Sequence, residues 1–470
     1  MPGQDMFAGT HFNPNSTWWR QSEGFLSYIN RSQWMLRQGL FVADVLYYYG
    51  DHAPNFAGIR ASNPAKLPAG YDYDVASEYV LLQRASVKDG RIVLPDGMSY
   101  AVLVLPPYRC ISQPVLRKLD EMAKAGAVLV GPRPDSSSGL AAWQEGDTEA
   151  RSLIDRLWGS GTQTAQVKFS DTAAWLKETR LPPDFADVGT DDNRLDYIHR
   201  RDGKTNIYFV DNPSGKPVQT DVRFRVQGKI PEFWDPRNGT IRTLPEWRST
   251  DDGRIEIPME LESYGSGFVV FRDDAPAGSM EQRSSGRNFP EMKPLCEITG
   301  PWELAFDPAW FYPDNGSGGR MVFEQLTDWT KHPDEAVRYF SGAAVYRTSF
   351  DLPIALKAGP ETAYISLGKV REMARVTLNG RDLGIAWCPP WQVPVPAGLL
   401  ATKGNHLSIE VVNFWPNRLI GDVKLPPGQR RTRTNITKFE KPKGDKHYTT
   451  LMPSGLLGPV RLTKAAVSSN

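Results

Sequence analysis

Three uninterrupted apolar segments in the first third of the chain constrain its fold more than any other feature. They cover residues 41–49, 101–107 and 127–131, and residues 112–126 between the last two carry apolar side chains at helical spacing. Strands that are apolar on both faces and alternate with helices are typical of a parallel sheet with helices on both sides. The sequence therefore predicts a doubly wound α/β domain over residues 39–188.

The pattern changes after residue 189 to short strands in which apolar and polar residues alternate. Strands are predicted at 205–211 and 219–226, with turns at 212–215 and 237–239. This spacing indicates an antiparallel β-sandwich over residues 189–273. Residues 274–290, rich in Ser, Gly, Pro and charge, are predicted to be a linker.

The last part, residues 291–470, carries many more short strands, at 343–352, 362–367, 374–378 and 407–412. Asn379-Gly380 between two of these runs is a strong hairpin signal. We expect a jelly-roll sandwich here.

Residues 1–38 form a polar loop followed by an amphipathic segment, which predicts a helix over 17–38. No strand or helix precedes it as a packing partner. We therefore expect the remnant of a larger domain, with apolar surface exposed at Trp18, Trp19 and Phe25.

Bulk composition excludes several classes of protein. A chain of 470 residues is too long for a single hydrophobic core, so several domains are expected. The 55 Lys+Arg and 54 Asp+Glu nearly cancel, which gives no reason to expect a polyanionic partner. The basic run 430–446 is predicted to be a solvated loop rather than a nucleic-acid site.

The sequence shows no signal peptide and no apolar run that could cross a membrane. The chain as written is therefore expected in the cytoplasm, and a full-length parent could be periplasmic or secreted.

The three cysteines, Cys110, Cys296 and Cys388, lie far apart and outside any CxxC pair. We expect them to be small buried hydrophobic residues, without a disulfide or a zinc site.

Familiar catalytic motifs are absent: the sequence has no GxSxG, no phosphate loop, no HExxH and, after the first predicted strand, no GxGxxG. Glycoside cleavage needs two carboxylates near each other. Asp72 and Asp74, with Tyr73 between them, are the best local candidates, because aromatic neighbours raise a carboxyl pKa and stack on sugars. The alternative is that both aspartates cap a turn before a strand at 79–82.

Two further clusters combine aromatic and polar side chains. One lies before the first helix and could form a rim for sugar hydroxyls, although Asn15 or Ser16 could instead be the helix N-cap; it comprises His11, Asn13, Asn15 and Trp18. The other lies in the predicted jelly roll and comprises Trp391, Trp415 and Arg418. The alternative for the tryptophans is core packing, and Arg418 could pair with Asp422 to tie two loops together.

These segments resemble the C-terminal half of the α-L-rhamnosidases of glycoside hydrolase family 106. The resemblance rests on residues 9–19, 36–47, 70–74, 231–236, 379–384 and 415–422, in that order along the chain. It implies a (β/α)8 catalytic barrel upstream, with glutamates as acid and base and a calcium ion in its active site. The first 38 residues would be the last loop and helix of that barrel, so His11, Asn13 and Asn15 would border the substrate. The α/β domain resembles a glutamine-amidotransferase-like domain, and the jelly roll resembles the galactose-binding-like domain of family 2.

No catalytic glutamate of the family has a counterpart in this chain, and no cofactor or metal is expected within it. Three hypotheses follow. The chain is the accessory portion of a rhamnosidase-like enzyme, with a rhamnose-containing oligo- or polysaccharide as ligand and the missing barrel as a partner. Alternatively, it is a stand-alone carbohydrate-binding or scaffold protein, or an enzyme that uses Asp72, Asp74 or Glu78. None of the three involves nucleic acid or a membrane.

Overall fold

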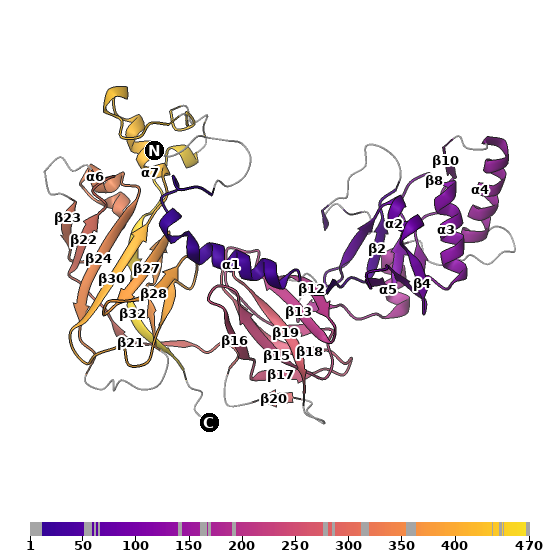
Figure 1. The fold of residues 1–470 in the computed structure, drawn as a ribbon, viewed down its shortest axis with the longest axis horizontal. Helices are drawn as coiled ribbons and strands as arrows, with labels where there is room; N and C mark the ends of the chain where they lie inside the picture. The colour runs from indigo at the N-terminus through magenta and orange to yellow at the C-terminus, as the bar shows by residue number, and fades with distance from the viewer. Residues whose placement is uncertain are drawn as a thin grey trace. The chain divides into compact units, whose positions relative to one another are not determined.

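The computed structural model describes residues 12–50, 59–60, 63, 66–139, 143–159, 167, 171–189, 194–275, 281–283, 287–311, 319–353, 363–434, 436–440, 444 and 446–466. The chain divides into two compact units. The first unit contains Met1–Ser32, Pro236–Asn238 and Phe289–Asn470, and the second contains Gln33–Asp235 and Gly239–Asn288. Figure 1 labels their helices and strands.

The second unit begins with the parallel sheet that the apolar runs predict. Its strand order is β3 (Tyr73–Ala76), β2 (Val45–Tyr48), β7 (Val102–Val104) and β9 (Leu129–Val130), with parallel pairing throughout. All four residues of β2 are buried, and they alternate between two apolar clusters: Leu46 and Tyr48 belong to one, Val45 and Tyr47 to the other. The predicted run 41–49 is therefore divided between β2 and β1 (Leu40–Phe41), and β1 pairs with residues 200–201 in another sheet.

Helices cover both faces of this sheet. The cluster that contains Leu46 is filled by α3 (Gln113–Lys124) and α4 (Trp143–Trp158), and the opposite cluster contains Trp175 of α5 (Thr172–Thr179). A short helix, α2 (Glu78–Gln83), occupies the place where a strand is predicted at 79–82, so that prediction is wrong. Smaller strands complete this part: β4 (Ser86–Lys88), β5 (Arg91–Val93) and β6 (Ser99–Tyr100), and the parallel pair β8 (Cys110–Ser112) and β10 (Ser136–Ser138).

Two antiparallel sheets form the rest of the second unit. The six-stranded sheet has the order β1, β12 (Asp196–Asp202), β13 (Thr205–Asp211), β19 (Ser266–Asp274), β15 (Lys229–Asp235), β16 (Thr240–Thr243). The five-stranded sheet has the order β11 (Phe185–Asp187), β14 (Val218–Phe224), β18 (Ile255–Leu261), β17 (Glu246–Ser249), β20 (Glu281–Arg283). β20 lies inside the segment predicted as a linker and pairs with β17.

Aromatic rings join these two sheets face to face. The ring centroid of Phe224 on β14 lies 5.0 Å from that of Tyr208 on β13 and 5.4 Å from that of Phe271 on β19. All three side chains are fully buried. This packing is the sandwich that alternation along the strands predicts.

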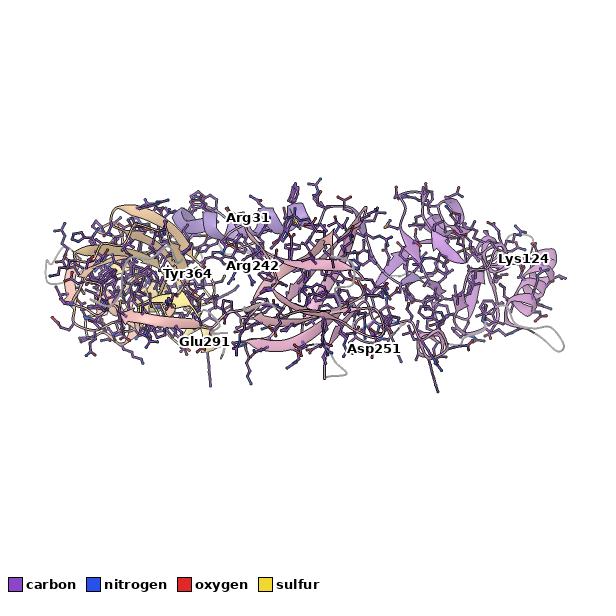
Figure 2. All side chains as sticks on the ribbon, turned by 90° about the horizontal axis from the view of Figure 1, so that it is seen from below. Arg31, Lys124, Arg242, Asp251, Glu291 and Tyr364 are labelled. Atoms are coloured by element: carbon purple, nitrogen blue, oxygen red, sulfur yellow. The ribbon has the colours of Figure 1, made fainter. Side chains whose placement is uncertain are left out.

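The first unit contains two further antiparallel sheets around one core. The larger has the order β23 (Arg320–Phe323), β22 (Trp302–Phe306), β24 (Ala343–Phe350), β30 (Asn405–Val412), β27 (Met373–Leu378), β28 (Arg381–Ala386). The smaller has the order β21 (Met292–Glu297), β32 (Arg461–Ala465), β25 (Ala363–Ser366), β29 (Gln392–Val395). One apolar cluster takes Trp302 and Ile409 from the larger sheet and Ile365 and Leu462 from the smaller. Figure 2 shows side chains filling this part of the molecule, with Tyr364 of β25 labelled.

The short elements of the first unit lie mainly in its connections. They are β26 (Lys369–Arg371), paired with β31 (Gly455–Gly458), the helices α6 (Glu335–Arg338) and α7 (Pro416–Val423), and the 3-10 turns Trp329–Lys331, Pro427–Gln429 and Lys446–Tyr448. The predicted hairpin between β27 and β28 is confirmed: Asn379 (φ 48°) and Gly380 (φ 80°) both adopt the left-handed conformation that a tight two-residue turn requires.

The predicted N-terminal helix is present as a 3-10 turn, Trp19–Gln21, followed by α1 (Ser22–Met35). Its aromatic side packs within the first unit: the ring centroids of Phe25 and Tyr28 each lie 5.3 Å from that of Trp387. Gly24 permits this approach, because a Cβ there would lie 2.9 Å from the Trp387 ring. In the second unit, Met35 packs on Ile207, Phe268 and Val270 of the six-stranded sheet.

The expectation of an exposed apolar surface at Trp18, Trp19 and Phe25 is therefore wrong, since all three are half-buried. The aromatic side chains exposed in this region are those of Phe12 (48%) and Trp34 (62%). Phe25 is covered by Trp387, a residue remote in sequence, and Trp18 packs on Phe12 and Phe25.

The prediction that the three cysteines are buried is wrong. Cys110 is exposed on β8, and Cys296 and Cys388 are half-buried. None of the three forms a disulfide. Among the described residues, no helix combines the length and the apolar character that crossing a bilayer requires.

Candidate functional site

The N-terminal loop of the first unit meets the segment where β30 ends and α7 begins. Asn13, Asn15 and Trp18 come from the N-terminal loop, and Trp391, Trp415 and Arg418 come from the sheet connections. His11 lies outside the described residues.

Hydrogen bonds join the N-terminal loop to this end of the sandwich. The indole Nε1 of Trp415 donates to the carbonyl oxygen of Asn15 (2.7 Å), and the Thr17 hydroxyl donates to the carbonyl oxygen of Asn413. The loop is also stiffened internally, because the Asn13 side-chain oxygen accepts from the Asn15 amide (2.9 Å). The structure thus brings together two clusters that are 400 residues apart in sequence.

The alternative reading of Asn15 or Ser16 as a helix N-cap is wrong. The first helical turn begins at Trp19, and the residue before it, Trp18, makes no side-chain capping bond. Trp18 instead contacts Phe12 and Phe25, with ring centroids 5.7 and 6.4 Å away. The side chain of Asn15 is exposed and that of Asn13 is half-buried, so both amides reach the surface of the loop.

The two predicted tryptophans of the sandwich differ in their surroundings. Trp391 packs on the edge of the core, with the guanidinium of Arg371 5.9 Å from its ring centroid. Trp415 is half-buried, and its ring meets that of Trp310 edge to face at 5.2 Å. Each indole therefore has one side in contact with protein.

Arg418 and Asp422 form the predicted ion pair, 3.9 Å apart, but they lie one turn apart on α7. Asp422 makes the link to a second segment by itself: its Oδ2 accepts from the backbone amide (2.7 Å) and the hydroxyl of Thr432. Both charged side chains are buried, at 8% and 2% exposure. Their geometry suits holding the loop after α7 in place.

Sequence reasoning missed two buried amides that shape this end of the sandwich. Asn413 accepts from the Gly342 amide and donates to the Phe340 carbonyl and the Ser454 hydroxyl, each at 2.9 Å. Asn417 also donates to the Ser454 hydroxyl (2.9 Å). The Asn-Phe-Trp-Pro-Asn run was visible in the sequence, but the partners of its amides were not.

Glu372, which follows Arg371 in the chain, was also missed. Burial raises the pKa of the Glu372 carboxyl, and the nearby Arg371 guanidinium only partly offsets this effect. The two side chains approach within 3.8 Å. A carboxyl that gains a proton more readily than usual is thus available at this end of the sandwich.

The second unit holds the predicted pair Tyr73 and Asp74. Asp74 accepts from the Tyr100 hydroxyl (2.7 Å) and from the Val75 amide (2.8 Å). Burial and this contact with Asp74 raise the pKa of Tyr100. The carboxylate is therefore bound to a neighbouring strand of its own unit.

Asp72, two residues earlier, has different partners. Its Oδ1 accepts from the Tyr73 amide (2.9 Å), and Arg60 lies 3.7 Å away. Burial raises its pKa to about 6, against the lowering effects of the Tyr73 amide and Arg60. Glu78, the third candidate, accepts from the Ser112 hydroxyl (2.7 Å). The three carboxylates thus have three separate sets of donors.

A buried charge network in the second unit had no signal in the sequence. Arg225 donates to both carboxylate oxygens of Asp44 (2.9 and 3.0 Å) and lies 3.5 Å from Asp184. Asp184 also contacts His199 Nδ1 and accepts from the Tyr208 hydroxyl, each at 2.9 Å. Burial opposes ionisation of Asp184, yet His199 and Arg225 lower its pKa, whereas burial raises the pKa of Asp44.

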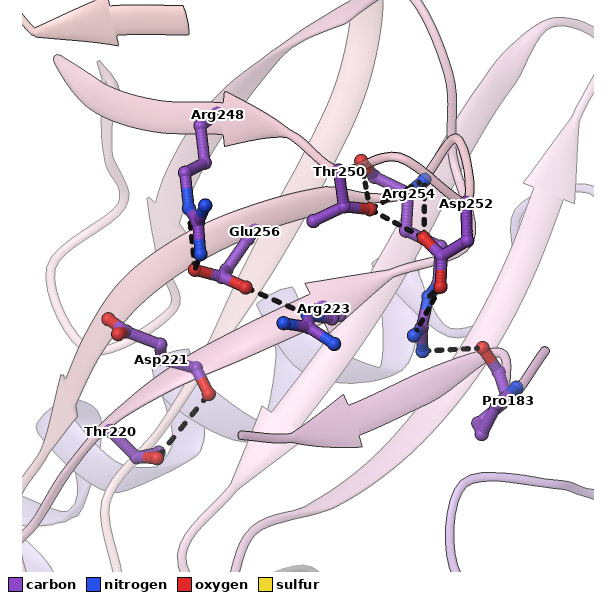
Figure 3. A network of polar contacts seen from close by, with 9 residues as sticks. All are labelled: Pro183, Thr220, Asp221, Arg223, Arg248, Thr250, Asp252, Arg254 and Glu256. Atoms are coloured by element: carbon purple, nitrogen blue, oxygen red, sulfur yellow. Dashed lines mark hydrogen bonds and ion pairs between the residues drawn. The ribbon is translucent and has the colours of Figure 1, made fainter. Parts of the chain in front are cut away.

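A second network lies on the five-stranded sheet (Figure 3). Glu256 on β18 accepts from Arg223 on β14 (2.7 Å) and from Arg248 on β17 (2.8 Å), and both arginines are its cross-strand neighbours. Nearby, Asp252 holds Arg254, with a nitrogen–oxygen distance of 2.7 Å. The two arginines satisfy Glu256 across strands, whereas Asp252 and Arg254 pair within the turn between β17 and β18. In the described part of the chain, no three His, Cys, Asp or Glu side chains gather as a metal site would require.

Comparison with known proteins gives three findings. The sequence model of the α-L-rhamnosidase family, glycoside hydrolase family 106, matches residues 1–248. A protein of Formosa agariphila named "Putative beta-glucuronidase" is 38% identical, and the match covers 97% of this chain and 58% of that protein. The structure of a rhamnosidase from Novosphingobium sp. PP1Y superposes with a TM-score of 0.83 at 30% identity, covering 98% of this chain and 43% of that one. This chain therefore spans about half the length of the proteins it matches.

Proposed function

Because this chain belongs to the α-L-rhamnosidase family, glycoside hydrolase family 106, we propose that it is the C-terminal accessory portion of a rhamnosidase-like enzyme. Its ligand would be a rhamnose-containing plant or microbial polysaccharide. The catalytic carboxylates, and the calcium ion that the family resemblance implies, would lie in an N-terminal barrel outside this chain. The observation that carries the proposal is coverage: nearly all of this chain matches a rhamnosidase, but only 43% of that rhamnosidase is matched.

The arrangement of carboxylates supports this division of labour. Hydrolysis of a glycosidic bond needs two carboxyl groups about 5 to 10 Å apart on opposite sides of the bond. Asp72 is held by the Tyr73 amide and Arg60, and Asp74 by Tyr100. In the buried network of the second unit, Asp44 is paired with Arg225. Each of these carboxylates is paired with donors of its own unit, which supports a structural role for it.

The accessory units would line the edge of the active site and pack against the catalytic barrel. Asn13 and Asn15 belong to the loop that the family resemblance assigns to the substrate side of the barrel, and the hydrogen bond from Trp415 holds that loop. The barrel would cover the exposed Phe12 and Trp34 rings, as part of the same polypeptide or as a separate chain.

A second candidate function, a stand-alone carbohydrate-binding or scaffold protein, is favoured by one observation. The aromatic side of α1 already packs on Trp387 within the first unit, so this helix has a partner in the chain itself. Isothermal titration with rhamnose and neutral rhamnosides separates the candidates. Saturable binding by the chain alone supports the second, and absence of heat supports the first.

The coding DNA around Met1 provides the test of the proposal. Any reading frame continuous with, or directly 5′ to, Met1 is expressed with this chain, and release of nitrophenol from an aryl α-L-rhamnoside is measured. We expect turnover when an upstream segment with barrel strands and two acidic residues is included. An upstream sequence without such a segment, or a combined product without turnover, contradicts the proposal.

A further inference from the structure

Two tryptophans from different connections of the first unit meet edge to face. Trp310 lies between β22 and β23, and Trp415 is the N-cap residue of α7. Their ring centroids are 5.2 Å apart, and their planes are inclined by 79°. Both side chains are half-buried, so the rings form a corner in which part of each indole reaches the surface.

Other parts of the first unit hold both tryptophans in place. The Trp415 indole Nε1 donates to the Asn15 carbonyl (2.7 Å), and the Ser341 hydroxyl donates to the Trp415 carbonyl (3.2 Å). The Trp310 amide donates to the Asp307 carbonyl (3.0 Å), and the Trp310 side chain packs against the apolar core of the unit. Because both rings are already fixed, little conformational freedom is lost when a ligand binds to them.

An exposed amide lies beside this pair of rings. The hydrogen bond from Trp415 places the Asn15 backbone at the Nε1 edge of the indole, and the Asn15 side chain is exposed. The Asn13 side-chain oxygen accepts from the Asn15 backbone amide (2.9 Å), which fixes the turn that carries it. A side-chain amide offers two hydrogen-bond donors and an acceptor oxygen. We call Trp310, Trp415 and Asn15 the indole corner.

The chemistry of the indole corner matches that of a neutral sugar. A pyranose ring has C–H groups on its faces and hydroxyl groups around its rim. The indoles suit the faces, and the Asn15 amide suits the hydroxyls. Two rings close to a right angle contact one sugar unit from two sides. None of the three side chains is charged, so a charged ligand would find no opposite charge among them.

We propose that the indole corner is a binding site for a neutral oligosaccharide. This inference rests on the proposed function, because an enzyme that removes rhamnose from a polysaccharide acts on one sugar unit and leaves the rest of the chain outside its catalytic pocket. The indole corner would hold those remaining sugar units and not the rhamnose itself. It would thus be an accessory site, separate from the active site assigned to the barrel.

The test measures binding of tetrasaccharides to the full chain by isothermal titration. Xylotetraose, cellotetraose and mannotetraose are neutral and contain no rhamnose, and tetragalacturonate is the charged comparison. Trp310→Leu removes one ring of the indole corner, and Asn15→Ala removes the amide at an exposed position. Phe439→Leu is the matched control, because Phe439 and Tyr448 form another half-buried edge-to-face pair in the same unit, with centroids 5.2 Å apart.

We expect at least one neutral tetrasaccharide to bind saturably, with the same affinity at low ionic strength and at about 0.15 M salt. Trp310→Leu should weaken this binding about tenfold and Asn15→Ala about threefold, whereas Phe439→Leu should stay within about twofold of the parent. Melting temperatures show whether each variant is folded. If Trp310→Leu does not fold, the affinity of Asn15→Ala decides the outcome.

Four results overturn the proposal: no binding of any neutral probe, tighter binding of tetragalacturonate, equal weakening in Trp310→Leu and Phe439→Leu, or unchanged affinity in Asn15→Ala. Rhamnoside hydrolysis with an upstream segment is measured separately, so failure here leaves the proposed function standing.

Discussion

Replacing Asp72 by Asn should stabilise the second unit at neutral pH. Burial raises the pKa of Asp72 to about 6 from an ordinary value of 3.8. Between these two values the folded chain keeps a proton that the unfolded chain has lost, so the free energy of unfolding falls as pH rises from about 4 to 6. The difference corresponds to about 3 kcal/mol, which is fully lost above pH 6.

An Asn at this position keeps an oxygen for the Tyr73 amide but carries no charge. We therefore expect the variant to be about 2 to 3 kcal/mol more stable than the parent at pH 7 and equal to it at pH 3.5. Asp184, whose pKa is lowered by His199 and Arg225 despite its burial, changes stability in the opposite sense, but it contributes equally to both proteins.

Native-state hydrogen exchange of amides in β2 and β7 measures the stability of this part alone, which matters because the chain has two units. Asp221→Asn, at an exposed position of the same unit, is the control, and its effect should stay within about 0.5 kcal/mol. If the parent and Asp72→Asn show the same slope between pH 4 and 6, the raised pKa and its burial argument are wrong.

Three further perturbations test the packing and the buried charges. Gly421→Ala should destabilise the first unit by about 1 to 3 kcal/mol, because the new Cβ would lie 2.7 Å from Tyr339, whereas Gly428→Ala, in open space, should change the melting temperature little. Arg225→Met should cost about 3 to 5 kcal/mol in urea unfolding of the second unit, since it leaves two buried carboxylates without their guanidinium; a loss below 1 kcal/mol would contradict this. Asp422→Ala should speed tryptic cleavage after Arg430, Arg431 and Arg433, because the loop loses its anchor; unchanged cleavage would show that other contacts hold it.

Local sequence patterns predicted the elements well where one periodicity dominates. The strand at 205–211 coincides with β13, the helix at 112–126 contains α3, and Asn379-Gly380 forms the hairpin turn. Residues 79–82 failed because four apolar residues in a row fit a short helix as well as a strand. Periodicity carries no information to separate the two at that length.

Contacts between remote segments could not be predicted from local patterns. The bond from Trp415 to Asn15 spans 400 residues, and that from Arg225 to Asp44 spans 181. Trp415 could be picked out as a candidate because it lies in an aromatic and polar cluster of the sequence. Arg225 could not, because it is one of many arginines in segments where polar and apolar residues alternate. Whether a side chain is buried likewise depends on which remote segment covers it. The charged Arg418 is buried, whereas the less polar Cys110 on β8 is exposed.

The most direct test of the central claim is hydrolysis of an aryl α-L-rhamnoside by the purified chain alone, alongside Asp74→Asn. An accessory portion should release nitrophenol no faster than buffer, in both proteins. Turnover by the parent that disappears in Asp74→Asn would show that this chain carries its own catalytic carboxylate and would contradict the account.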